Sequence, residues 1–351
     1  MLLPTTASTV WILAIVALVC LGSWANMLKL AGKWRFEYFD LDFVVGLLLS
    51  AGAAAFLLGT ARPQDLTFQD NMLLAGYRKM AWAVGSGVVF DLGTLLLVAA
   101  MAISGMSVAF PLALGVALLL GTIWDITSGA QPSWVPMAGG MVLLLAGIVS
   151  VALAYVWRLQ EQKQAVQAPL RPDPRAKSAR AKQPGGALAV ILAIAGGIVL
   201  SLFPLALSQG TFGENGLAPY SAVLLLSVGA LLSAPIFVLF FITFPVSGDS
   251  AGGYLSGKAK QHLLGLAGGV LLGGGMLSGL LSAGAPAGLQ LSPLPQYALS
   301  HGAFLLAAAW GLLAWREFQG SGDRVRMLVT GMLVLCLGGV GLVAFALSQG
   351  K

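Results

Sequence analysis

The chain consists of long apolar runs separated by short polar segments, and this pattern restricts its fold more than any other feature. A helix that crosses a bilayer needs about 20 mainly apolar residues. Only 9% of the 351 residues are charged and 58% are hydrophobic, whereas soluble domains have about 25% charged and about 45–50% apolar residues. The sequence therefore predicts an all-α, multi-pass membrane protein. The ten expected spans are 9–30, 43–60, 80–104, 107–125, 135–157, 187–208, 221–246, 262–284, 296–315 and 325–347.

The distribution of Lys and Arg predicts how these spans are oriented. The long polar segment 158–186 holds seven Lys and Arg residues and four prolines, so we interpret it as a flexible basic linker that cannot bury a core. Cytoplasmic loops carry an excess of Lys and Arg. With the linker in the cytoplasm, 15 of the 19 basic residues fall on that side and both termini are external. We expect a bacterial inner (cytoplasmic) membrane, and the net charge of +6 then reflects orientation, not a nucleic-acid partner.

The two halves on either side of this linker show an ordered series of short matches. The residues Ile12–Ile15 recur as Ile191–Ile194, and Leu47–Ala53 resemble Leu224–Ala230. Each half has five expected spans, an odd number, so the second half would cross the membrane in the opposite direction. Inverted repeats are typical of alternating-access transporters, whose site lies near the midplane. We therefore expect 1–157 and 187–351 to be two inverted five-helix repeats joined by 158–186.

Several short motifs in these runs match the order found in a known family. They are Leu21-Gly22-Ser23-Trp24-Ala25, Tyr38-Phe39-Asp40-Leu41-Asp42, Gln69-Asp70-Asn71, Gly87 to Thr94, Gly105-Met106-Ser107-Val108, and Trp310-Gly311 followed by Trp315-Arg316-Glu317-Phe318. On these residues the chain resembles the drug/metabolite transporter superfamily, and within it the ureide permease branch and its glucose–ribose and rhamnose porter relatives. The resemblance implies a permease for a small polar solute that is ureide-like or nucleobase-like. A sugar is the alternative.

Asp91 is the first candidate for a functional role. It lies near the middle of the third expected span, and no span has a Lys or Arg in its middle part that could neutralise it, since Lys29 and Arg326 stand at the ends of theirs. A charged Asp at the bilayer centre costs about 2.5–3.5 kcal/mol on insertion scales, and such residues are usually functional. We expect Asp91 to bind a proton or to accept a hydrogen bond from the solute, and a proton would then be the coupling ion. The alternative is a protonated Asp bonded to a neighbouring Ser or carbonyl group.

Other polar and aromatic residues complete the expected binding site. His301 and Tyr297 share the ninth span, where a neutral imidazole can both donate and accept a hydrogen bond; a buried histidine bonded to a hydroxyl is the alternative. Trp24 and Phe203 hold equivalent places in the two halves and could stack on a planar ring or a sugar face, with simple packing as the alternative. The expected solute-binding residues are Trp24, Asn26, Asp91, Thr94, Phe203, Tyr297 and His301.

Two further carboxylates lie near opposite membrane faces, at the ends of equivalent spans. Asp125 and Glu317 are either gates or simple interfacial charges. The chain has two cysteines, both inside apolar runs, and two histidines in different spans. This set predicts no catalytic group, no metal site and no cofactor, so an enzyme is not expected. A non-transporting receptor or scaffold remains an alternative. Expected partners are a small solute, protons and the lipid bilayer, and the chain is expected to be a monomer or a homodimer.

Overall fold

The computed structural model describes residues 1–61, 66–167, 186–246 and 253–350, and every regular element in these residues is helical. Within these described ranges, nine helices are long and apolar enough to cross a membrane, or up to ten if one bent pair forms a single span. This confirms the all-α class. The helices are α1 (Ala7–Ser23), α2 (Asn26–Ala31), α3 (Phe36–Leu57), α4 (Phe68–Ser104), α5 (Met106–Thr127), α6 (Trp134–Gln167), α8 (Gly186–Thr211), α9 (Pro219–Thr243), α10 (Ala259–Ala283), α11 (Pro293–His301), α12 (Ala303–Ala309) and α13 (Asp323–Ser348), with short turns η1 (Tyr254–Ser256) and η2 (Trp310–Ala314).

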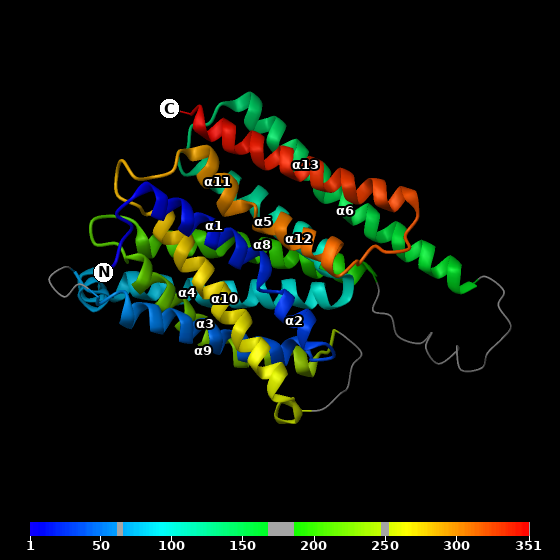
Figure 1. Ribbon diagram of the computed structural model, residues 1–351, viewed down its shortest axis with the longest axis horizontal. Helices are drawn as coiled ribbons and strands as arrows, with labels where there is room; N and C mark the ends of the chain where they lie inside the picture. Colours follow the sequence, from blue (N-terminus) through cyan, green and yellow to red (C-terminus); the bar gives the residue numbers. More distant parts are fainter. Residues whose placement is uncertain (62–65, 168–185, 247–252, 351) are drawn as a thin grey trace.

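The long helices lie side by side along one axis of the molecule (Figure 1). Helix α3 packs against α10, α4 packs against α8 and α9, and α6 packs against α13. Helix α1 contacts α10 and α12, and α5 contacts α8. Both chain ends lie at one end of the bundle, while the end of α6 and the start of α8 lie at the other (Figure 1). For brevity we call these the Asp125 end and the Glu317 end, after the carboxylates found there.

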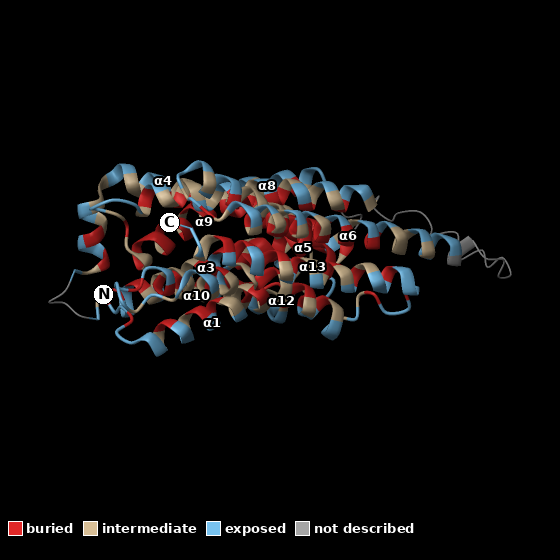
Figure 2. Ribbon diagram, turned by 90° about the horizontal axis from the view of Figure 1, so that it is seen from above, coloured by how far each residue is buried: buried red, intermediate tan, exposed pale blue. Residues whose placement is uncertain are grey.

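The buried residues lie in the centre of the bundle (Figure 2), and many of the exposed residues on its outer surface are large and hydrophobic. On α9, for example, Leu232, Ile236 and Leu239 are each more than 60% exposed. A surface of this kind is unusual in a soluble protein but suits contact with lipid chains. The chain is therefore a multi-pass integral membrane protein.

Close helix contacts depend on glycine at two places. A Cβ atom on Gly46 or Gly269 would lie 2.1 or 1.9 Å from a carbonyl oxygen across the α3–α10 contact. On Gly87 or Gly229 it would lie 2.0 or 1.9 Å from a carbonyl oxygen across the α4–α9 contact. Small residues allow helix backbones in membranes to approach each other this closely.

Several helix limits differ from the sequence prediction. Helix α3 begins at Phe36 instead of 43, and α4 begins at Phe68 instead of 80, where Thr67 and Asp70 form a capping box. Helix α6 continues to Gln167, so 158–167 are helical and not part of a flexible linker. These positions are rich in Gln, Glu and Lys, which favour helix outside the bilayer as well. The rest of the expected linker, 168–185, lies outside the described residues.

Two expected spans are broken. The first is interrupted at Trp24 and Ala25, between α1 and α2, and the ninth bends by 43° at Gly302, between α11 and α12. A broken helix leaves backbone groups available inside the membrane, which is tolerated where protein or a cavity surrounds them. Both breaks lie next to residues that line the cavity described below.

Candidate functional site

A cavity of about 730 Å³ lies between α1, α4, α5, α8, α10, α11 and α12. Its lining includes Trp124 and Asp125 near the end of α5, and Phe212 just after α8, all of which are exposed. At its other limit are Trp24 and Phe110, which are buried. The cavity thus extends from the middle of the bundle to the Asp125 end. It is large enough for a small organic solute.

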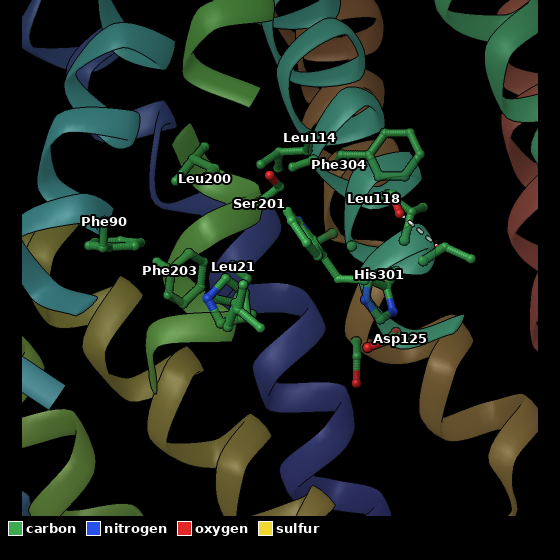
Figure 3. Close-up of a pocket in the computed structure, with 18 of the residues that line it drawn as sticks. Leu21, Phe90, Leu114, Leu118, Asp125, Leu200, Ser201, Phe203, His301 and Phe304 are labelled. Carbon is green, nitrogen blue, oxygen red and sulfur yellow. Dashed lines mark hydrogen bonds between the residues drawn. The ribbon is translucent and has the colours of Figure 1, made fainter. Parts of the chain in front are cut away.

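Aromatic side chains form much of the wall. Phe203 meets Phe90 edge to face, with ring centroids 5.2 Å apart, and Figure 3 shows both on one side of the cavity. Trp24 packs against Phe110 with centroids 5.9 Å apart. Trp24 and Phe203, the two aromatic residues expected from the sequence, therefore line the same cavity from separate clusters.

The polar part of the cavity is centred on α11. The Nδ1 atom of His301 lies 3.0 Å from the carbonyl oxygen of Tyr297, and the two rings are 4.1 Å apart. The hydroxyl of Tyr297 lies 3.1 Å from that of Thr122. Asp125 interacts electrostatically with the Tyr297 phenol, and Figure 3 shows its carboxyl on the same side of the cavity as His301. The structure therefore brings together Tyr297, His301 and Asp125, which the sequence placed in two different groups.

Hydroxyl groups add to the lining at several points. Thr94, expected from the sequence, faces the cavity from α4, whereas Thr122, Ser201 and Ser208 were not expected. The Ser201 hydroxyl donates to the Ile198 carbonyl at 2.7 Å. A Ser or Thr that bonds to its own helix is common in membrane helices, so its presence in the sequence gives no signal that it lines a cavity.

Asp91 lies on α4 but is not part of the cavity lining, although Phe90 and Thr94 beside it are. Its side chain is 1% exposed, and one carboxyl oxygen accepts a hydrogen bond of 2.8 Å from Ser233 of α9. The other oxygen has no hydrogen-bond partner among the described residues. Asp40 of α3 is equally buried, also has one unpartnered oxygen, and interacts electrostatically with Asp91. The two carboxyls thus form a buried pair behind the cavity wall.

Asn26 also lies outside the cavity lining. Its amide nitrogen donates to the Ser23 carbonyl at 2.9 Å, and its amide oxygen accepts from the Trp315 indole at 2.6 Å. These bonds connect the break between α1 and α2 to the segment after η2. In this structure Asn26 therefore braces the Glu317 end.

Glu317 closes the opposite end of the bundle from the cavity mouth. Its carboxylate accepts the backbone N–H groups of Met106 and Ser107, each at 2.8 Å, and the Ser107 hydroxyl. Lys29 lies 2.7 Å from it. The carboxylate thus caps the N-terminus of α5, where N–H groups have no partner within the helix and favour negative charge. We call Glu317, Lys29 and the first turn of α5 the Glu317 cluster.

The surroundings of Glu317 are tightly fitted. Gly105, before α5, has φ +93°, and a Cβ atom there would lie 2.7 Å from the Glu317 carboxyl carbon. Arg316, which precedes Glu317, has φ +48°, a left-handed backbone conformation that is rare for residues other than glycine. Burial alone would raise the pKa of Glu317, but Lys29 and the bonds from Ser107 outweigh it and hold the pKa below its ordinary value.

Comparison with known proteins gives limited matches. No family model matches the chain. Ureide permease 3 of Arabidopsis thaliana is 29% identical over 111 residues, which cover 31% of this chain and 32% of that protein. The chain thus matches about a third of the length of this relative. A solved structure, titled "Crystal structure of protein", aligns over 96% of both chains with a TM-score of 0.51 and 15% identity; at this identity the likeness concerns the fold alone.

Proposed function

We propose that the chain is a transporter of a small polar solute that works by alternating access, described here with its cavity open at the Asp125 end. The observation that carries this proposal is the asymmetry of the bundle along its axis. A lined cavity reaches one end, while buried residues and the Glu317 cluster close the other. From the positive-inside rule, the Asp125 end is external and the Glu317 end cytoplasmic.

The helix contacts support two inverted repeats. In such an arrangement α1, α3, α4 and α5 correspond to α8, α9, α10 and the α11–α12 pair. A twofold relation between the repeats would then turn each helix contact into a second one. The α3–α10 contact would become α4–α9, the α4–α8 contact would become α1–α10, and the α5–α8 contact would become α1–α12. All six contacts occur in the structure. Rocking of one repeat against the other around a central site is the expected mode of transport.

The glycine contacts support the same relation. Counted from the helix starts, Gly46 of α3 and Gly229 of α9 are equivalent, and a Cβ atom on either would lie 2.1 Å or less from a carbonyl oxygen. This register differs by six residues from the sequence match of Leu47–Ala53 with Leu224–Ala230, which sets Gly52 opposite Gly229. Gly87 and Gly269, which lie in the similar segments Ser86-Gly87-Val88 and Gly268-Gly269-Val270 of the two halves, make the reciprocal close contacts on the partner helices. The same kind of glycine-mediated helix contact would thus occur twice in the inverted-repeat arrangement. The resemblance to the drug/metabolite transporter superfamily fits this architecture.

A planar, nitrogen-containing solute of the ureide or nucleobase kind suits the cavity best. Its walls carry the rings of Trp24, Phe90, Phe110, Phe203 and Phe304, and aromatic walls with a few polar groups are typical of sites for small ring compounds. The partial match to a protein named ureide permease 3 points in the same direction. Thr94, Tyr297 and His301 would supply the hydrogen bonds.

Asp91 is the proposed proton-coupling residue, and its buried pairing with Asp40 supports this role. Two carboxylates that face each other in a low-dielectric interior cannot both stay charged without a counter-ion. Among the described residues, neither Asp91 nor Asp40 takes part in a salt bridge. Because Asp91 sits directly behind Phe90 and Thr94, a change in its protonation would act on the cavity through α4, without contact with the solute.

The test is uptake by the purified full chain in proteoliposomes, with and without an inward proton gradient. The panel contains uracil, xanthine, allantoin, ribose, glucose and rhamnose. We expect gradient-stimulated uptake of at least one ring-nitrogen compound, and Asp91→Asn should abolish the stimulation. Asp323→Asn, which changes the exposed carboxylate at the first residue of α13, should keep it. Uptake of sugars alone would replace the proposed solute class with the sugar alternative. No uptake by folded protein would contradict transport and favour a receptor or scaffold.

A further inference from the structure

The cavity carries a single fixed charge. Among the described residues that line it, Asp125 is the only Asp or Glu, and there is no Lys or Arg. No salt bridge between described residues involves Asp125. Lys79, at the same end, directs its ammonium group to the Phe212 carbonyl at 2.9 Å. Asp125 thus gives the entrance of an otherwise apolar cavity a negative potential.

The polar atoms next to Asp125 are hydrogen-bond acceptors. A carbonyl oxygen only accepts, so His301 donates its Nδ1 proton to Tyr297 and the neutral imidazole keeps Nε2 as an acceptor. The Thr122 hydroxyl gives its proton to the Leu118 carbonyl at 2.9 Å. The Tyr297 hydroxyl must then donate to Thr122, which leaves lone pairs on the phenol oxygen. This end of the cavity therefore suits a group with N–H donors and a positive charge.

The rest of the wall favours the same kind of ligand. The phenyl and indole rings around the cavity attract a cation through their faces and pack against a ring through their area. The volume of about 730 Å³ accommodates a single-ring or two-ring compound with room for water. A carboxylate or phosphate would find no cation in the lining, and it would meet the charge of Asp125 directly.

We propose that Asp125, with His301 and Tyr297, is a charge-selecting site that binds the protonated nitrogen of a small ring-bearing solute and excludes anions. This rests on the proposed function only in taking the cavity as the solute site. It assigns Asp125 a recognition role beyond a gate. The solute would carry an ammonium, amidinium or protonated ring nitrogen, and so would differ from the ureides, nucleobases and sugars of the uptake panel, none of which is a cation at neutral pH. Its cationic nitrogen would lie near Asp125 and its ring near Phe90 and Phe203.

Binding of three matched probes to the purified full chain tests this proposal. Benzylammonium, benzyl alcohol and benzoate share one ring and differ in charge at neutral pH. Quenching of tryptophan fluorescence reports binding, because Trp24 and Trp124 line the cavity. We expect benzylammonium to bind about tenfold or more tightly than benzyl alcohol, since its hydrogen bond to Asp125 is charge-assisted, and benzoate to bind least.

Substitutions locate the effect. Asp125→Asn should remove the difference between benzylammonium and benzyl alcohol, and Asp125→Glu should retain it. Glu214→Gln removes an exposed carboxylate that is outside the cavity lining and should leave the preference unchanged. Thermal unfolding of each variant checks that it is folded. Equal binding of the three probes to the unmodified chain, or a preference that survives Asp125→Asn, would overturn the proposal.

These results are separable from the transport proposal. Charge-selective binding without any uptake in proteoliposomes would support this site and contradict transport. Uptake of solutes with no difference in affinity among the three probes would support transport and overturn the charge-selecting site.

Discussion

Glu317 shows how one side chain can hold two distant parts of the chain together. Its carboxylate joins Lys29 of α2 to the first turn of α5, at the end of the bundle that the cavity does not reach. Helix N-termini stabilise a nearby carboxylate, and the adjacent Gly105 leaves room for it. The resemblance-based motif around Glu317 identified the residue, but its partners 210 and more positions away follow only from the fold.

Glu317→Gln should loosen the first turn of α5. The amide can replace only part of the bonding of a carboxylate, and charge-assisted bonds contribute about 1.5–3 kcal/mol. We expect hydrogen exchange at the Met106 and Ser107 amides to become about tenfold faster or more. The control is Asp323→Asn, which removes an exposed carboxylate at the same end. Unchanged exchange in Glu317→Gln would show that the cluster does not hold this end closed.

The pH dependence of the same amides tests the charge of Glu317. Its pKa in the folded state is below the ordinary value of a glutamate, about 4.3. A carboxyl group whose pKa is lower in the folded than in the unfolded state stabilises the fold at any pH above its unfolded-state pKa. This contribution is lost as the pH falls through the folded-state pKa. The excess protection of the Met106 and Ser107 amides in the unmodified chain, relative to Glu317→Gln, should therefore stay constant from neutral pH to about 4.3 and decline below it. A decline centred near pH 6 would contradict this assignment.

At the scale of helices, glycines determine which pairs pack closely. Gly87→Ala places a methyl group 2.0 Å from a carbonyl oxygen of α9, whereas Gly85→Ala on the same helix meets nothing within 4 Å. We expect Gly87→Ala to destabilise the fold by about 1–3 kcal/mol, and Gly85→Ala to be neutral or stabilising because alanine favours helix. Thermal unfolding in detergent micelles measures both. A similar melting temperature for the two variants would show that the α4–α9 contact is looser than described.

The helices were predictable because a bilayer requires long apolar segments, and this requirement is written directly in the sequence. Their limits were less so. The sequence prediction started this span at 80, directly after Arg78 and Lys79, whereas the structure extends α4 back to Phe68 with a non-helical glycine at 76. The pattern of apolar residues in the sequence does not indicate the breaks at Trp24–Ala25 and Gly302.

The direction in which each side chain points was the least predictable feature of the site. Helix α4 is apolar on nearly all its faces, so no polar stripe indicates which side meets the cavity. Thr94 lines the cavity as expected, whereas Asp91, three residues earlier, faces Asp40 and Ser233 instead. Depth along the span identified Asp91, and the resemblance-based motif Gly87 to Thr94 identified Thr94, but packing against α3, α8 and α9 decides their orientation.

At the scale of the whole molecule, the open cavity at one end and the closed cluster at the other describe one state of the proposed transport cycle. The cavity is accessible at the Asp125 end, and the Glu317 cluster closes the other end. In the proposed orientation, which follows from the distribution of basic residues, the open end faces the outside. Transport then requires that the cavity open at the Glu317 end while the Asp125 end closes, and the six exchanged helix contacts suggest how the repeats would rock.

The most direct test of this account is the sidedness of access to the cavity. Ala117, which lines the cavity on α5, is replaced by cysteine in a chain with Cys20→Ala and Cys336→Ala, and sealed vesicles of either orientation are treated with a membrane-impermeant thiol reagent. The account predicts labelling from the Asp125 side with Glu317 intact, and additional labelling from the Glu317 side after Glu317→Gln. Labelling from the Glu317 side with Glu317 intact, or labelling from neither side in both variants, would contradict it.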